Sequence, residues 1–377
     1  MEWKEVTLGE IAIFKTGKLN SNAAISNGEY PFFTCSPETL RINSYAFDQE
    51  AILLAGNNAE GNFSIKYYKG KFNAYQRTYV ITPKRGKVDI KFLYYALSLC
   101  LKQLKNMSQG TSTKFLTVTI LNSFSVQLPS FSDQRRIASI LSSLDRKIEL
   151  NNKINADLEE MAQAIFKNWF VDFEPFKDGK FVNSELGMIP EGWKVVAFDN
   201  ILKVTTMKTG KEGIPEYSVT NTGIHPRDEK FTKNLSKSSA KNKLIRKGNL
   251  VFGMSREILN WGIMKEEVGG VSSAYNVYLV DENIVNTIYL ECFIAQRMDY
   301  FADLIKPASR EGQGVDKALL LKKIICIPPS EIMDVFLEKY DSIMHLAEIR
   351  KQESSHLSLL RDTLLPRLMS GEIEVPE

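Results

Sequence analysis

A long heptad pattern occurs twice in this chain, and it constrains the fold more than any other feature. In the first copy, residues at alternating steps of four and three are Ile137, Leu141, Leu144, Ile148, Asn151, Asn155, Leu158, Ala162, Ile165 and Trp169. Adding 199 to each position gives a second series, namely Phe336, Tyr340, Ile343, Ala347, Arg350, Ser354, Leu357, Arg361, Leu364 and Leu368. Residues at this spacing share one helix face and form the seam of a coiled coil. Two such helices in one chain most simply pair with each other.

Both predicted helices have polar seam residues at the same central places, Asn151 and Asn155 in the first copy and Arg350 and Ser354 in the second. Polar residues within a seam lower stability but fix register and orientation. The first helix should begin near Ser130, because an aspartate three residues later resembles a capping box. Each helix covers about 33 residues and is therefore roughly 50 Å long. The alternative is that each helix packs only on its own half of the chain.

The sequence outside the helices is also doubled. Trp3-Lys4 is repeated at Trp193-Lys194, and KTGK at 15–18 returns at 208–211. The dipeptide QG at 109–110 returns at 313–314. A period near 190 residues indicates a duplicated domain, since solenoid repeats span about 20–50 residues. The alternative is chance similarity of short words, which carry little weight singly.

Each half combines strands with helices. Short β-branched and aromatic runs, such as EAILLAG and GNLVFG, are typical of strands, and residues 90–105 and 288–305 carry helical spacing. We predict an α+β fold in which two mixed α/β domains in tandem repeat are separated by two long α-helices pairing as an antiparallel coiled coil. The predicted boundaries are 1–132 (first domain), 133–171 (first long helix), 172–329 (linker and second domain) and 330–377 (second long helix and tail).

Composition and motifs argue against several function classes. The four cysteines form no C-x-x-C pair, which disfavours a zinc ribbon. The N-terminus lacks the order of a signal peptide, and no apolar run reaches the roughly 20 residues that span a bilayer, so we expect a soluble, cytoplasmic protein. The phosphate-loop, dinucleotide-binding, H-E-x-x-H and G-x-S-x-G motifs are absent. We therefore predict a chain that is not an enzyme and has neither a cofactor nor a metal of its own.

Features of nucleic-acid binding are better supported. From Gly61 to Val88 there are seven basic residues, no acidic residue and several aromatic residues. Such stretches attract phosphate, although a lysine-rich stretch can also be a solvated face. Base reading needs paired donors and acceptors, and loops carrying Arg, Asn or Gln recur at three places in each half. The predicted DNA-binding residues are Lys15, Lys18, Asn57, Asn58, Lys71, Tyr75, Gln76, Arg77, Gln109 and Lys114, followed in the second half by Lys208, Lys211, Ser255, Arg256, Tyr275, Asn276, Arg310, Gln313 and Lys317.

Two strings in the long helices are similar to those of a known family. The segment from Gln134 to Phe176, which contains WFVDFEPF, resembles the central conserved region of the specificity (S) subunits of type I restriction-modification systems. LLRDTLLPRLMSGEIEV resembles the region that ends those subunits. The resemblance extends over the whole chain, because the doubled architecture matches too.

The resemblance implies a function. Residues 1–132 and 172–329 would hold the two target recognition domains, each reading one half of a bipartite, asymmetric site on double-stranded DNA. The helices would act as spacer and as docking surface for two methyltransferase (M) subunits, with restriction (R) subunits completing the complex. S-adenosylmethionine, ATP and Mg²⁺ would belong to those partners. Two alternatives remain: a sequence-independent DNA-binding coiled-coil scaffold, and a stand-alone nuclease or methyltransferase with degenerate motifs.

The helix length predicts the form of the DNA site. At about 3.4 Å per base pair, a spacer of roughly 50 Å spans at most about 15 base pairs. We therefore expect two specific blocks separated by several unread base pairs. Partner docking needs apolar residues outside the seam, or these residues contact the recognition domains instead: Ile140, Ile154, Met161, Phe166, Val335, Met344, Leu360 and Leu365.

Overall fold

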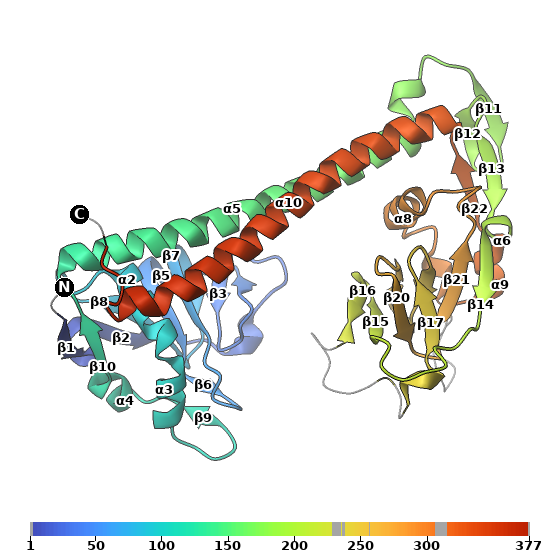
Figure 1. The fold of residues 1–377 in the computed structure, drawn as a ribbon. Coiled ribbons are helices and arrows are strands. Elements are labelled where there is room, and N and C mark those ends of the chain that lie inside the picture. Colours follow the sequence, from blue (N-terminus) through green and yellow to red (C-terminus); the bar gives the residue numbers. More distant parts are fainter. Residues whose placement is uncertain (1–2, 228–234, 236–237, 256, 306–314, 376–377) are drawn as a thin grey trace. The chain divides into compact units, whose positions relative to one another are not determined.

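The computed structural model describes residues 3–227, 235, 238–255, 257–305 and 315–375 (Figure 1). The chain divides into two compact units. Unit 1 comprises Met1–Ile154 and Ile349–Glu377, and unit 2 comprises Asn155–Glu348. The long helices are α5 (Phe131–Phe170) and α10 (Ser330–Met369), so each unit contains one part of both.

Unit 1 is built on a six-stranded sheet of order β2-β8-β5-β7-β3-β4, in which β3 and β7 are parallel and the other neighbours antiparallel. Its strands are β2 (Ala12–Thr16), β3 (Tyr30–Phe33), β4 (Leu40–Ile42), β5 (Phe47–Ala55), β7 (Ile65–Ala74) and β8 (Thr78–Pro83). Two smaller pairs are β1 (Lys4–Thr7) with β10 (Ser125–Leu128), and β6 (Asn57–Asn58) with β9 (Lys114–Phe115). The helices are α1 (Leu8–Ile11), η1 (Ser21–Ala23), α2 (Ile90–Leu99), α3 (Leu101–Met107) and α4 (Val118–Ser123).

The core of unit 1 explains why β5 is a continuous apolar run. Ile52 and Leu54 face one cluster, formed with α2 and the long helices, whereas Ala51 and Leu53 face a second cluster on the other side of the sheet. A strand covered on both faces does not need polar alternation. The helix predicted over 90–105 is interrupted at Cys100, whose ψ of 2° separates α2 from α3.

Unit 2 contains a four-stranded sheet of order β14-β21-β18-β19 and several two-stranded pairs. The sheet strands are β14 (Leu202–Thr205), β18 (Leu250–Phe252), β19 (Trp261–Ile263) and β21 (Asn276–Val280). The paired strands are β11 (Phe181–Ser184), β12 (Gly187–Pro190), β13 (Lys194–Ala197), β15 (Tyr217–Thr220), β16 (Gly223–Pro226), β17 (Lys243–Arg246), β20 (Val268–Val271) and β22 (Ile324–Ile327). The helices are η2 (Glu174–Phe176), α6 (Phe198–Ile201), η3 (Ser239–Lys241), α8 (Thr287–Gln296), η4 (Ala302–Leu304) and α9 (Lys317–Lys322). Helix α8 ends earlier than the predicted helix over 288–305.

The two units repeat one topology, as the doubled sequence predicts. In chain order, β2, β5, β7 and β8 correspond to β14, β18, β19 and β21, and both sets form the same spatial order, β2-β8-β5-β7 and β14-β21-β18-β19. The pair β1–β10 corresponds to β13–β22. Helices α2 and α8 occupy equivalent places after the last sheet strand. The mixed α/β character predicted for both halves is therefore confirmed.

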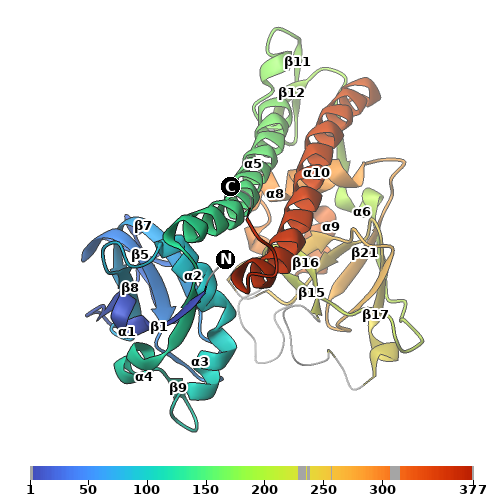
Figure 2. The same cartoon turned by 60° about the vertical axis from the view of Figure 1, so that its left-hand side comes forward.

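The long helices pair antiparallel within unit 1. Asn151 on α5 contacts Glu353 on α10 at 2.9 Å, and Asp145 contacts Arg361 at 2.7 Å, so the numbering runs in opposite directions. Helix α5 is capped at the predicted residue, because Ser130 Oγ accepts from Asp133 N and donates to Asp133 Oδ2. Asn151 is fully buried, and Ser354 is nearly so. Figure 2 shows α2 next to these helices from a second direction.

Within unit 2 the helices meet through aromatic rings. The ring of Phe336 on α10 lies 5.7 Å from that of Phe166 and 4.9 Å from that of Phe170, both on α5. Phe170 also contacts Tyr289 of α8 and Trp193. The end of WFVDFEPF is anchored here as well, since Phe173 and Phe176 make edge-to-face contacts with Trp193. The seam residues of both helices are buried or half-buried along their length.

The predicted apolar residues outside the seam differ in exposure, and Ile154 and Met344 are half-buried. Met161, Val335 and Leu360 are exposed, as partner docking requires. Phe166 is fully buried in the core of unit 2, which agrees with the alternative that it contacts a recognition domain. Ile140 and Leu365 are partly buried against the core of unit 1. Among the described residues, no helix is both long and apolar enough to cross a membrane.

Candidate nucleic-acid interface

A hollow of about 370 Å³ in unit 1 brings the predicted base-reading loops together. Its walls come from the end of β2, from β6, from the β7–β8 turn and from β9, and the lining residues are Thr16, Gly56, Asn57, Gln76, Arg77, Tyr79, Phe115 and Leu116. Three of these, Asn57, Gln76 and Arg77, were predicted from sequence. Figure 1 shows β6 and β9 together at the lower edge of unit 1.

Short backbone pairings fix the loops. Asn57 pairs with Phe115 and Asn58 with Lys114 between β6 and β9, and Gln109 bridges to Phe115. Gly56 N donates to Arg77 O at 2.7 Å, and Leu116 N donates to Gly56 O at 2.8 Å. The loops around residues 56, 77 and 115 are therefore joined through main-chain hydrogen bonds, although they are distant in sequence.

The side-chain oxygens of the two asparagines of β6 differ in whether they accept a hydrogen bond. Asn58 Oδ1 accepts from the backbone N–H groups of Glu60 and Asn62, at 2.9 and 3.0 Å, and so closes its own loop. Asn57 Oδ1 is buried at the wall of the hollow and has no hydrogen-bond partner among the described residues. Buried polar atoms are normally satisfied. Asn57 is thus the stronger candidate for contact with a ligand.

A fourth segment, which the sequence indicated only through KTGK, completes this edge. Gln76 N donates to Leu19 O at 2.9 Å, and its side-chain Nε2 donates to Asn20 Oδ1 at 2.7 Å. Gly17 packs so closely that an added Cβ would lie 1.6 Å from Ala74 O. Lys15 and Lys18, on either side of this contact, are exposed.

Lys71 and Tyr75 are among the predicted residues of unit 1 that do not line the hollow. Lys71 is on β7, with Nζ 4.7 Å from the centre of the Tyr45 ring. Tyr75 is half-buried and bridges to Leu19.

Tyr79 supports the wall of the hollow, because its hydroxyl donates to Leu116 O at 3.0 Å. Burial raises the pKa of Tyr79.

In unit 2 two of the predicted lysines, Lys208 and Lys317, lie near Lys243, which was not predicted as a site residue. Lys243 on β17 bridges to Lys208, and its Nζ donates to Tyr275 O. Burial, and then the charge of Lys317, lower the pKa of Lys243. Lys208, Lys211 and Lys317 are exposed. The sequence did not single out Lys243, because it is one of several lysines in the same stretch and no local pattern marks the one that bonds to the Tyr275 carbonyl.

Two predicted contact residues of unit 2 support loops instead. Ser255 is 1% exposed, and its Oγ accepts from Asn260 N at 2.8 Å. Asn276 is 7% exposed, and its Nδ2 donates to Val315 O. Neither side chain is exposed in this structure, and their contact with DNA stays a prediction. Arg256, Arg310 and Gln313 lie outside the described residues.

A carboxylate holds one loop of the basic stretch. Glu212 accepts hydrogen bonds from the hydroxyls of Ser238 and Ser239 and from Ser239 N, and these bonds lower the pKa of Glu212 to about 2. Glu212 therefore stays ionised and bonded to these donors, in a segment whose sequence neighbours include Lys211 and Lys241. In the part of the chain that the structure describes, no group of three or more His, Cys, Asp and Glu residues is arranged to hold a metal.

Comparison with known proteins shows which sequences this chain is similar to. Residues 1–160 match the family described as type I restriction modification DNA specificity domain. The chain is 38% identical over 227 residues to the type I restriction enzyme EcoDI specificity subunit of Escherichia coli, a match that covers 55% of this chain and half of that relative. It is 24% identical over 412 residues to the MjaVIII specificity subunit of Methanocaldococcus jannaschii, covering 99% of this chain and 93% of that one.

The fold is also similar to that of a specificity subunit. The crystal structure of a type I restriction-modification system S subunit from M. genitalium superimposes with a TM-score of 0.56, covering 100% of this chain and 96% of that chain at 14% identity. At this identity the likeness concerns the fold alone. By sequence, the first 160 residues match the type I restriction modification DNA specificity domain, and the chain is similar to type I restriction enzyme specificity subunits.

Proposed function

We propose that the chain is the non-catalytic DNA-reading subunit of a type I restriction-modification complex, and that each unit reads one half of a bipartite, asymmetric DNA site. The observation that carries the proposal is the hollow of unit 1, where loops rich in Asn, Gln and Arg converge on one edge. Amide and guanidinium groups can read purine edges in the major groove, and the exposed lysines beside them can neutralise phosphates. Since unit 2 repeats the topology with different loop residues, the two half-sites should differ.

The proposal assigns the chemistry to partners. Two methyltransferase subunits would dock on exposed apolar side chains of the long helices, and restriction subunits would complete a cytoplasmic complex that uses S-adenosylmethionine, ATP and Mg²⁺. Exposed residues that support docking are Leu150, Leu359 and Leu360 in unit 1 and Met161, Val335 and Leu346 in unit 2. Large apolar side chains that gather on a surface commonly mark protein interfaces.

The test is selection from a pool of random DNA duplexes by the chain in complex with its methyltransferase subunit, followed by sequencing. Two unlike sequence blocks with a fixed unread gap are expected. Binding without enrichment and with a steep salt dependence would instead establish a sequence-independent scaffold. Cleavage or methylation by the purified chain alone would overturn the non-catalytic assignment.

A further inference from the structure

The side-chain amide of Gln76 is held in place before any ligand arrives. Its Nε2 donates to Asn20 Oδ1 at 2.7 Å, across 56 residues of sequence. The backbone beneath it is fixed as well, because Gln76 N donates to Leu19 O and Tyr75 bridges to Leu19. Gly17 allows this close approach, since any Cβ there would overlap Ala74 O. The 17–20 segment therefore buttresses the turn that carries Gln76.

The contact with Asn20 leaves one N–H group and the carbonyl oxygen of the Gln76 amide available for a ligand. An amide carries two N–H donors and one carbonyl acceptor, and among the described residues Asn20 is the one hydrogen-bond partner of the Gln76 side chain. One N–H and Oε1 remain, and the planar amide holds both in one plane. Gln76 is exposed and lines the hollow, so both groups can be reached from solvent.

We propose that Gln76 reads an adenine in the first half-site and that Asn20 is its positioning residue. This inference rests on the proposed function. Adenine presents an N7 acceptor and an N6 donor in the major groove, and an amide satisfies both at once. A reader that is already oriented loses less conformational entropy on binding. The Asn20 bond supplies that orientation, and it also uses the second N–H, which would otherwise be free to turn toward another acceptor.

The neighbours of Gln76 suit this role. Arg77 is exposed on the same turn and lines the same hollow, where a guanidinium can bind a phosphate or a guanine. The acidic residue nearest in the adjoining loop, Glu60, accepts from Asn62 Nδ2 at 3.1 Å and so is engaged within its own loop. The hollow therefore presents donors and amides at the place where a base edge would enter.

The experiment is duplex selection by the full chain in complex with its methyltransferase subunit, with five single variants compared with the wild type. Gln76→Ala should lose the adenine preference at one position of one block and bind the wild-type consensus about 5- to 150-fold more weakly. Gln76→Glu should change the preferred base there to cytosine, whose N4 amino group donates to a carboxylate. Gln127→Ala, an exposed glutamine on β10, is the matched control and should change nothing.

The Asn20 variants separate positioning from a structural effect. Asn20→Ala should weaken the preference at the same position several-fold and leave all other positions unchanged. Asn20→Asp keeps the acceptor, so it should retain the adenine preference while its charge lowers affinity for all duplexes equally. A two-block wild-type motif that Gln76→Ala leaves intact would overturn this inference and leave the proposed function standing. A wild-type selection without any motif would overturn both.

Discussion

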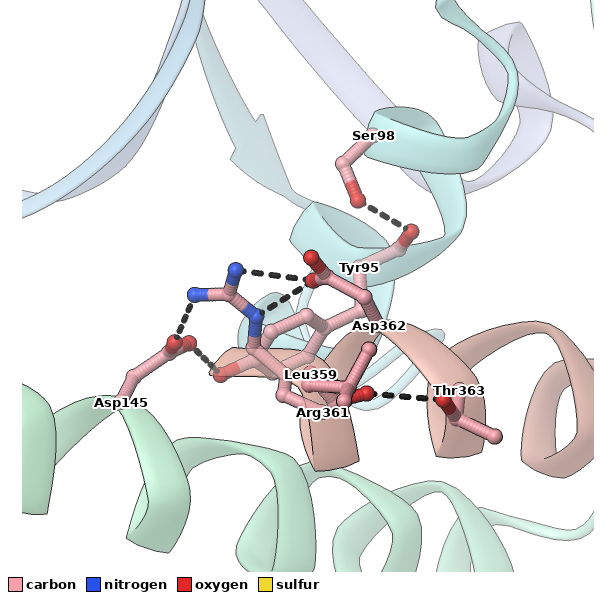
Figure 3. A network of polar contacts seen from close by, with 7 residues as sticks. All are labelled: Tyr95, Ser98, Asp145, Leu359, Arg361, Asp362 and Thr363. Atoms are coloured by element: carbon pink, nitrogen blue, oxygen red, sulfur yellow. Dashed lines mark hydrogen bonds and ion pairs between the residues drawn. The ribbon is translucent and has the colours of Figure 1, made fainter. Parts of the chain in front are cut away.

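Arg361 of α10 donates from Nη1 to Oδ1 of Asp145 on α5 at a distance of 2.7 Å (Figure 3). The second oxygen of Asp145 accepts from the hydroxyl of Tyr95 on α2 at 2.5 Å, and Arg361 also contacts Asp362. One carboxylate thus links three helices of unit 1. Burial, and then the hydrogen bond to Asp145, raise the pKa of Tyr95, so this tyrosine stays a donor.

Replacement of Asp145 by alanine should destabilise unit 1 by about 1–3 kcal/mol, because the Tyr95 hydroxyl loses its acceptor and the half-buried guanidinium of Arg361 is left with its bonds to the exposed Asp362. Amide hydrogen exchange of α2 should rise in the variant, measured by mass spectrometry on the full chain. Arg367→Ala is the control, since it removes an exposed pair with Glu372 and should change stability by less than about 1 kcal/mol. Equal protection of α2 in both variants would contradict the linking role.

Unit 2 lacks this link although it repeats the fold. The positions that correspond to Asp145 and Arg361 by the 199-residue repeat are Met344 and Ala162. They line a hollow of about 380 Å³ together with Cys292 of α8. The duplicated helices therefore attach to their units by different means, a polar link in unit 1 and the aromatic cluster around Phe336 in unit 2.

The two cysteines of unit 2 should be unreactive in the folded chain. Burial raises the pKa of both Cys292 and Cys326 to about 12. Because the thiolate is the nucleophile, both thiols should resist iodoacetamide at pH 8 and react only near pH 12 or after unfolding. Peptide mass spectrometry of labelled protein measures this. Rapid labelling of Cys326 at pH 8 in the folded chain would show that its surroundings open.

Substitution of the glycine in the two KTGK segments should change the stability of the chain by different amounts. Gly17→Ala places a Cβ against the carbonyl of Ala74 and should cost about 1–3 kcal/mol. Gly210 has a φ of +71° and open space around its Cα, so asparagine, which tolerates that conformation, should be nearly neutral there. Thermal unfolding of both variants gives the comparison. A neutral Gly17→Ala would mean that the 17–20 segment does not pack as described.

Sequence periodicity predicted what depends on local spacing. The heptad positions lie buried or half-buried along α5 and α10, because a seam repeats every 3.5 residues wherever the partner helix lies. The loops of the unit 1 hollow were also predicted, since Asn57 closely follows β5 and Gln76 and Arg77 lie between β7 and β8. In contrast, the Asp145–Arg361 pair joins residues 216 apart in sequence, and no local pattern shows it. No local pattern shows the contact of Asn20 with Gln76 either, since these residues are 56 apart in sequence. Nor does one show the burial of Ser255, which comes from loop packing.

Acid should weaken the helix pairing in unit 1 through Glu353. Hydrogen bonds from Asn151, then from Arg350, lower the pKa of Glu353. A lowered folded-state pKa contributes stability that is fully present above the unfolded value of about 4.5 and is lost as pH falls through the folded value. Urea unfolding between pH 2.5 and 6 should therefore show a steeper loss for the wild type than for Glu353→Gln. Parallel curves would contradict a role for this carboxylate.

The helices should also set the gap in the DNA site, if the proposed function holds. Removal of one heptad from each long helix keeps both seams in phase and shortens each by about 10 Å at 1.5 Å per residue. At about 3.4 Å per base pair, the unread gap should shrink by about three base pairs, while both specific blocks stay the same. Removal of four residues from each helix is the control, because it turns the seams away from each other and should abolish selection. A shortened chain that selects the original gap would show that the helices do not determine the spacing of the half-sites.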